Sequence, residues 1–284
     1  MYPTLFHVFG FRVDSYSVIW FIALIAAIMW TIRRLPVYQL DDYESRRVMA
    51  VSFIFMYVGA KSFEYIAHWG YYMADLTRFL DINRGGVHEF GAVSGAFLST
   101  MVMCIFPRKV SFSRLCDAAA PPALLAIAIG RWGCFLNGCC LGLPTTSFVG
   151  VHFPFDRAGV YRHPVQIYYS VIAFLIVGIL LAAEKRILPF QKTAAEFQEA
   201  KQLHDTGKIS GASHYSVIAP LAVILYCLMR LAVVPFRDRA PFMWMMNHSL
   251  TYRGIKFALP LMLLWLAYSL YRLKTAGQFR QNRP

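Results

Sequence analysis

Long apolar runs recur along the chain and limit what it can fold into. A helix needs about 20 mostly apolar residues to cross the hydrocarbon core of a bilayer. Seven segments of the 284-residue chain meet that requirement, some of them marginally: residues 15–33, 48–66, 91–107, 117–138, 165–183, 214–235 and 254–272. The sequence therefore predicts an all-α polytopic membrane protein, with a single membrane-embedded domain over residues 1–284.

The composition agrees with a membrane protein and excludes an ordinary soluble domain. Only 15% of the residues are charged and 58% are hydrophobic, whereas a soluble domain carries about 25% charged residues. The net charge of +13 does not by itself indicate nucleic-acid binding, because the cytoplasmic loops of membrane proteins are enriched in Lys and Arg.

The distribution of Lys and Arg predicts the orientation of the helices. Sixteen of them lie in the loops on one side of the seven predicted spans and eight lie in the loops on the other side. The richer side is expected to be cytoplasmic. We therefore expect the N-terminus outside and the C-terminus in the cytoplasm, with the basic loops facing anionic lipid and not nucleic acid. The polar stretch 185–213 then forms a cytoplasmic insertion.

The stretch from Ile129 to Gly142 is the most unusual part of the sequence. An uncharged run over residues 121–129 leads into Arg131. A charge at such depth costs several kcal/mol unless it is paired, so it marks a candidate functional site. Three glycines within nine residues allow a ligand or another backbone to approach closely. The alternative is an arginine that extends to the membrane surface above a glycine-rich packing face.

Polar side chains from six predicted spans share the outer face of the membrane in this topology. They include Tyr16, Lys61, Glu64, His88, Glu89, Arg131, Asn137, Arg162, His163, Gln166, Arg230 and Arg237. Five of them are Lys or Arg, which favours a site for an anion. The natural anion at that depth is a phospholipid head group, which arginine binds by paired hydrogen bonds. Lys61 and Glu64 have an alternative, because residues three apart can pair on one helix face.

Three cysteines and a histidine near this face have open roles. Cys134, Cys139 and Cys140 could form a metal site with His163, but their spacing is not that of a usual zinc motif. A disulfide is the second possibility, since the outer compartment is oxidising. His163, which precedes a proline at a predicted helix start, is either a structural hydrogen-bond donor or part of the site.

Several segments resemble the signatures of the prolipoprotein diacylglyceryl transferase family. Residues 131–142 are similar to its G-R-x-G-N-F-x-N-G-E-x-x-G signature, and residues 161–168 to its R-H-P-x-Q-L-Y segment. Residues 226–237 resemble its Y-x-x-x-R-F-x-x-E-F-x-R stretch, and residues 90–95 its H-G-G-L-I-G motif. Weaker likenesses at residues 11–16 and 59–61 extend the resemblance over nearly the whole chain.

The resemblance implies an activity and a site. Members of the family bind phosphatidylglycerol in the bacterial inner membrane and transfer its diacylglyceryl group to the lipobox cysteine of a prolipoprotein signal peptide. Arg131 and Arg230 are then expected to stabilise the leaving phosphate, and His163 or His88 to act as the base. The expected substrate-binding residues are Tyr16, Lys61, Gly91, Asn137, Gly142, Arg162, Gln166 and Arg237. The resemblance implies no metal, no organic cofactor and no nucleic acid.

The chain departs from the family pattern at four polar positions. Phe90 stands where the family has histidine, Cys134 replaces asparagine, and Cys139 and Val234 replace glutamates. These changes spare the arginines and glycines, so head-group binding is expected to be retained while proton transfer needs another base. The alternative function is a phospholipid-binding membrane protein of the same fold that is non-catalytic or has a different specificity.

Overall fold

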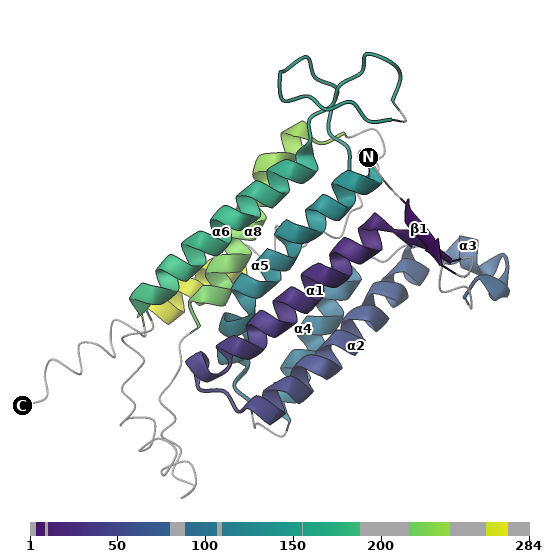
Figure 1. The fold of residues 1–284 in the computed structure, drawn as a ribbon. Coiled ribbons are helices and arrows are strands. Elements are labelled where there is room, and N and C mark those ends of the chain that lie inside the picture. Colours follow the sequence, from purple (N-terminus) through teal and green to yellow (C-terminus); the bar gives the residue numbers. More distant parts are fainter. Residues whose placement is uncertain are drawn as a thin grey trace, which may run out of the picture. The chain divides into compact units, whose positions relative to one another are not determined.

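The computed structural model describes residues 4–8, 11–79, 89–106, 110–154, 156–187, 216–238 and 260–271 (Figure 1). The chain divides into two compact units. The first comprises residues 1–33 and 116–284, and the second comprises residues 34–115. Each unit is described by itself. The prediction of a single membrane-embedded domain remains a prediction.

The first unit begins with a short hairpin that the sequence analysis did not predict. Strands β1 (Thr4–Val8) and β2 (Phe11–Asp14) pair antiparallel, with Thr4 opposite Asp14 and Val8 opposite Phe11. Helix α1 (Ser15–Arg34) starts directly after β2. The all-α prediction therefore holds for the apolar segments, and the hairpin precedes the first of them.

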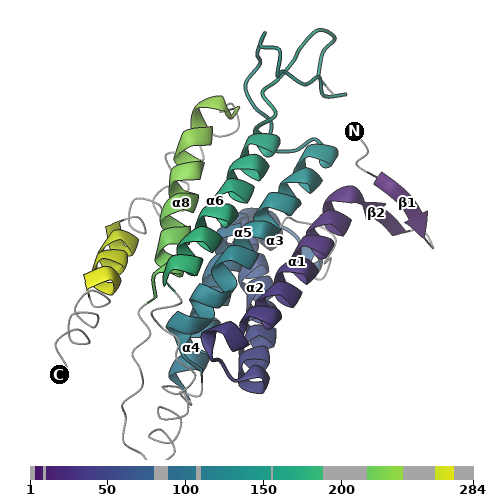
Figure 2. The same ribbon diagram turned by 60° about the vertical axis from the view of Figure 1, so that its left-hand side comes forward.

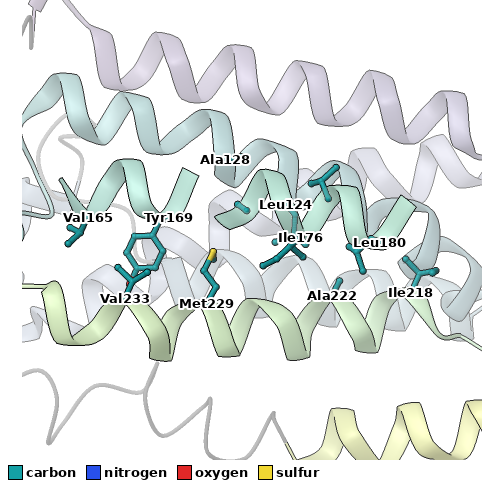
Figure 3. Packing of buried hydrophobic residues seen from close by; sticks show 12 residues of the cluster. Leu124, Ala128, Val165, Tyr169, Ile176, Leu180, Ile218, Ala222, Met229 and Val233 are labelled. Carbon is teal, nitrogen blue, oxygen red and sulfur yellow. The ribbon is translucent and has the colours of Figure 1, made fainter. Parts of the chain in front are cut away.

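Three helices of the first unit enclose its main apolar core. They are α5 (Phe112–Asn137), α6 (Val165–Ile187) and α8 (Ile218–Val233). Figure 3 shows Tyr169 and Val233 at one end of this core, with Leu180 and Ile218 at the other. Alanine at position 128, which is fully buried, keeps α5 and α6 close. The Ser170 hydroxyl consequently reaches the Ala128 carbonyl at 2.8 Å.

Helix α1 packs against α5 through small residues. Ala23, Ala27 and Ala126 form a separate buried cluster between the two helices. A side chain at Gly130 would lie 2.7 Å from the Trp20 ring, so glycine is what allows α1 to approach at this level. The glycine-rich stretch thus includes a helix-packing face, as one of the two sequence-based interpretations proposed.

A buried carboxylate joins α5 to the start of α8. Asp117 is 2% exposed. It accepts hydrogen bonds from the Ser216 hydroxyl at 2.6 Å and from the backbone N–H of Ala219 at 2.7 Å and of Val217 at 3.2 Å. The two N–H groups are among the donors that a helix N-terminus leaves without intrahelical partners. Asp117 therefore caps α8 from a distant part of the sequence.

The second unit is built on a close pair of helices, α2 (Asp42–Ala67) and α4 (Glu89–Ile105). A side chain at Gly59 would meet the Gly91 carbonyl, and one at Gly95 would meet the Phe55 carbonyl. The Ser52 and Thr100 hydroxyls share a hydrogen bond of 2.7 Å. Shorter elements complete the unit: η1 (Pro36–Tyr38), α3 (Trp69–Met73) and η2 (Leu76–Phe79).

Each predicted span coincides at least in part with a helix of the described residues. Within the described residues, four helices are long and apolar enough to cross a membrane: α1, α5, α6 and residues Ile218–Phe236, which combine α8 with the short helix η4 (Val234–Phe236). Gly91–Ile105 and Pro260–Tyr271 are apolar but shorter. The count of seven spans and the orientation therefore remain predictions. Most of the predicted cytoplasmic insertion, residues 188–213, lies outside the described residues.

Candidate functional site

Four helix ends of the first unit meet around the stretch that the sequence singled out. The C-terminal ends of α5 and α8 lie beside the N-terminal ends of α1 and α6, below the loop over residues 138–164 (Figures 1 and 2). Contacts agree with this view. Gly133 lies against Tyr16, and the Gln166 amide donates to the Cys139 carbonyl at 2.6 Å.

Two buried arginines share one aromatic ring at this end. The guanidinium carbon of Arg131 lies 4.7 Å from the ring centroid of Tyr169, and that of Arg230 lies 5.7 Å from the same centroid. Arg131 is 7% exposed, Arg230 is 8% exposed and Tyr169 is 1% exposed. A desolvated cation over an aromatic ring gains about 2 kcal/mol, whereas burying an ion costs several kcal/mol. Two such cations together suit an anionic ligand.

Helix α5 ends in a sharp reversal that carries the cysteines. Gly138 adopts a left-handed conformation, with φ of 69°. Its N–H reaches the Phe135 carbonyl at 3.1 Å, and the Cys139 N–H reaches the Cys134 carbonyl at 3.1 Å. These two bonds define a Schellman motif, which normally places glycine at this position. The sulfur atoms of Cys134, Cys139 and Cys140 all lie within 4.8 Å of one another.

A backbone ladder fastens the following loop over the end of α8. Leu143 donates to the Phe236 carbonyl at 2.8 Å, Asp238 donates to the Leu141 carbonyl at 3.1 Å, and Gly142 pairs with Arg237. A side chain at Gly142 would overlap the His163 carbonyl. Glycine is therefore required where this loop passes His163.

Arg162 is held by two carboxylates of the same region. Its Nε contacts both oxygens of Asp156 at 2.9 and 2.8 Å, and its Nη1 donates to Asp238 at 2.7 Å and to the Gly142 carbonyl at 3.2 Å. The Asp156 carboxylate raises the pKa of Arg162. Because two carboxylates compensate its charge, Arg162 fixes the loop. The sequence analysis expected Arg162 to bind the substrate directly, and that role stays a prediction.

His163 has one ring nitrogen engaged. Its Nδ1 lies 3.0 Å from the Tyr168 hydroxyl, and its ring packs edge-on against Phe236, with centroids 5.2 Å apart. Tyr168 and Phe236 therefore fix the orientation of the imidazole. Among the described residues, Tyr168 is the only hydrogen-bonding partner of the ring, and Nε2 makes no hydrogen bond to them.

Gln166 presents a buried acceptor. The residue is 0% exposed, and its Oε1 has no hydrogen-bond partner among the described residues. An unsatisfied buried polar atom costs about 1–3 kcal/mol. A ligand that donates a hydrogen bond, such as a head-group hydroxyl, would remove that cost.

Electrostatic interactions link the cysteines to the arginines. Hydrogen bonds from the thiols of Cys134 and Cys139 lower the pKa of Cys140, and the positive charges of Arg237 and Arg131 act in the same direction. The ladder between residues 141–143 and 236–238 explains why Arg237 lies near Cys140. The thiols, the arginines and His163 thus occupy one end of the first unit.

A family model, described as prolipoprotein diacylglyceryl transferase, matches residues 3–271 of the chain. The chain belongs to this family. A relative named phosphatidylglycerol–prolipoprotein diacylglyceryl transferase from Clostridium novyi is 32% identical over 195 residues, which cover 66% of this chain and 75% of the relative. One of the same name from Acaryochloris marina is 32% identical over 183 residues, covering 61% and 66%. Another from Bacillus cereus is 37% identical over 134 residues, covering 44% and 49%.

Most of the predicted site residues belong to the first unit. Tyr16, Asn137, Gly142, Gln166 and the four arginines are all in the first unit, as is His163. Lys61 and Gly91 lie on α2 and α4 of the second unit, and His88 lies outside the described residues. Glu64 contacts His68 at 3.1 Å, and its predicted pairing with Lys61 stays a prediction.

Sequence reasoning missed three residues that contact the arginines of the candidate site. Tyr169 contacts both Arg131 and Arg230 with its ring, and Asp156 and Asp238 bind Arg162. The sequence offered one signal for the carboxylates. The chain has only 15 acidic residues. Asp156 and Asp238 each stand beside an arginine in a predicted outer loop, so they could have been predicted as partners of an arginine. Tyr169 gave no such signal, because it is one aromatic residue among many in an apolar run.

Proposed function

We propose that this chain transfers the diacylglyceryl group of phosphatidylglycerol to the thiol of the lipobox cysteine in a prolipoprotein, forming a thioether. The printed names of the Clostridium novyi and Acaryochloris marina relatives include this donor and this acceptor. The observation that carries the proposal is the pair of buried guanidinium groups of Arg131 and Arg230 on the Tyr169 ring. The chain is accordingly a transferase of lipoprotein biosynthesis.

The arginines suit the departure of the phosphate. The lipobox sulfur attacks the glyceryl carbon that bears the phosphate ester. A C–S bond forms, the C–O bond breaks, and the electron pair leaves with glycerol phosphate. Negative charge grows on the leaving oxygen, where preorganised cations in a water-poor site act most strongly. Arg131 and Arg230 are the candidates for this role, and Arg237 for head-group binding.

Proton transfer falls to His163 in this proposal. The acceptor thiol loses a proton as it attacks, and a base must take it. In the tautomer whose Nδ1–H donates to the Tyr168 hydroxyl oxygen, Nε2 of His163 is the accepting nitrogen. Gln166 Oε1 is placed to accept a hydrogen bond from a head-group hydroxyl. His88 remains a second candidate base.

The proposed setting is the bacterial plasma membrane. Seven transmembrane helices, with the N-terminus outside and the C-terminus cytoplasmic, place the ends of α5 and α8 at the outer face. Phosphatidylglycerol would reach the arginines from the outer leaflet, and the lipobox of a signal peptide would approach from the same side. No nucleic acid is a partner in this proposal.

A phospholipid-binding protein without transferase activity is the second candidate. It is favoured by Cys134, Cys139 and Val234 at positions where the family pattern has polar or acidic residues. The deciding experiment follows labelled phosphatidylglycerol and a lipobox peptide with the purified chain in detergent. Label in the peptide supports the transferase. Lipid binding that depends on Arg131, without labelled peptide, identifies the binding protein.

A further inference from the structure

The end of α5 brings two thiols together through its backbone. In a Schellman motif the side chains at the third helical residue from the end and at the second residue beyond the cap lie in contact. Apolar side chains usually occupy these places. Here they are Cys134 and Cys139, and the Cys139 N–H donates to the Cys134 carbonyl at 3.1 Å. The helix stop therefore forces two sulfur atoms into proximity.

A second reversal adds the third thiol. Cys140 has a φ of 60°, a left-handed conformation that costs a residue with a side chain about 1–3 kcal/mol. This conformation turns the Cys140 side chain back toward the other two. All three sulfur atoms lie within 4.8 Å of one another.

The spacing of the sulfur atoms fits a thiophilic metal ion. With a zinc–sulfur distance of about 2.3 Å, tetrahedral thiolates are about 3.8 Å apart, which the three thiols reach by small rotations of their side chains. Cys134 is 4% exposed, while Cys139 and Cys140 are half-buried. Three ligands and an accessible side are the arrangement of a zinc site with an open fourth position.

The surroundings favour a negatively charged complex. Zinc with three thiolates carries one net negative charge, and a fourth thiolate adds another. Arg131 and Arg237 both act electrostatically on Cys140. The backbone ladder between Leu143 and Phe236 holds the Arg237 segment in place. Two positive charges are thus near the thiols, which lie in the region where the proposed reaction takes place.

We propose that Cys134, Cys139 and Cys140 bind Zn²⁺ and that the lipobox thiol of the acceptor becomes its fourth ligand. This proposal rests on the proposed function. A metal deprotonates a coordinating thiol, so the acceptor thiol would bind zinc as a thiolate and its proton would pass to the base. The zinc-bound sulfur then forms the C–S bond as the C–O bond breaks, and the thioether leaves the metal.

The site differs from the expectation of no metal that the family resemblance implied. The spacing of the cysteines is unlike a C-x₂-C pair, and spacing alone does not reveal that a Schellman motif and a left-handed residue bring the sulfur atoms together. In the structure all six cysteines are free thiols. The site also places a thiol-activating group where the chain departs from the family pattern, at Cys134 and Cys139.

Metal binding is tested without the reaction. The full chain is purified in detergent under reducing conditions, and its zinc content is measured by mass spectrometry after equilibration with Zn²⁺. We expect one zinc ion per chain. Replacing Cys134, Cys139 and Cys140 with Ser should abolish binding. The matched control replaces the other three cysteines, Cys104, Cys116 and Cys227, with Ser and should retain it. Equal binding by the two variants, no zinc in the reduced wild type, or a disulfide within the cluster overturns the site.

The role of the open position is tested with Co²⁺ in place of zinc. Adding a lipobox peptide should intensify the thiolate-to-cobalt absorption, and a peptide with Ser in place of its cysteine should not. An unchanged spectrum, or equal transfer rates with and without zinc after chelation, overturns thiol activation. A wild type that binds zinc and the peptide thiol but transfers no lipid contradicts the proposed function and leaves the metal site supported, so the two failures are distinguishable.

Discussion

One aromatic residue, Tyr169, contacts both buried arginines of the candidate site. Arg131 comes from the last turns of α5 and Arg230 from the last turn of α8, and both guanidinium groups face the ring. Tyr226 adds a second ring at 5.9 Å from Arg230. The planar guanidinium can stack on a ring and still direct N–H groups at a phosphate, which an ammonium cannot do.

Arg131 should be essential for transfer. Arg131→Ala should reduce the rate about 10²- to 10³-fold, the usual effect of losing one charge-stabilising group, without unfolding the protein. Arg131→Lys should fail as well, because it keeps the charge but loses the paired donors. Transfer of labelled lipid to a lipobox peptide measures both. Arg157→Ala, at an exposed loop arginine, is the control and should be silent. Normal activity of the Arg131 variants would mean that the phosphate binds elsewhere.

His163→Gln should lower transfer about 10²-fold, the usual scale for losing a general base. Tyr168→Phe removes only the hydroxyl beside Nδ1, so its loss should be smaller. His152→Gln serves as the control, because His152 lies in the same loop, is exposed, and contacts the Val160 carbonyl and the Tyr161 ring. If the His163 and His152 variants transfer lipid equally well, His163 is not the base and His88 becomes the candidate to test.

At the scale of elements, the two ends of α5 have different tasks. Its last two turns carry Arg131 and Cys134, and the helix ends at Asn137, just before Gly138, so that this end presents the site. Its first turns carry Asp117, which caps α8. This cap fixes where α8 begins, and the core between α6 and α8 fixes how the two helices pack. Together they determine where Arg230 lies in the first unit. The position of the site thus depends on a carboxylate at the opposite end of the helices.

Asp117→Ala should destabilise the protein by about 2 kcal/mol, because it leaves a buried helix N-terminus without its cap and strands several donors. Thermal unfolding in detergent should show a lower Tm. Asp42→Ala is the matched control, since Asp42 forms an exposed ion pair with Arg46 at 2.8 Å that contributes about 0–1 kcal/mol. Equal Tm values for the two variants would contradict the capping role of Asp117.

For the whole molecule, the charges of the loops relate the site to the membrane. The ends of α5 and α8 carry the candidate site, and Arg157 lies in the loop beyond α5. Lys185 and Arg186 lie in the last turn of α6, at its opposite end. The predicted orientation therefore places the site and the signal peptide on the outer side, while Lys185 faces the cytoplasm.

Labelling of single cysteines tests this orientation. In a chain whose six cysteines are replaced with Ser, Arg157→Cys should react with a membrane-impermeant maleimide in intact cells. Lys185→Cys should react only after the membrane is opened. The assay reports insertion and needs no activity. Reaction of Arg157→Cys from the cytoplasmic side alone would reverse the orientation and remove the proposed access from the outer leaflet.

The apolar runs alone were sufficient to predict the helices. Residues 15–33 and 165–183 agree with α1 and α6 to within a few residues, because an uninterrupted apolar run of membrane-spanning length has few alternatives to a helix. Arg131 was identified as a candidate site residue for a related reason, because a charge at the end of such a run is costly unless it is paired. The motifs at residues 131–142 and 161–168 predicted the family.

Only the tertiary structure decided which of these residues act together. Arg162 and Arg131 look equivalent in the sequence, yet two carboxylates hold one and an aromatic ring holds the other. The convergence of Cys134, Cys139 and Cys140 depends on two left-handed residues, which no periodic pattern signals. Apolar periodicity fixes single helices because each forms from its own backbone. Contacts between helix ends depend on caps and loops that are far apart along the chain, by hundreds of ångströms if the chain were extended. Only folding brings these segments together.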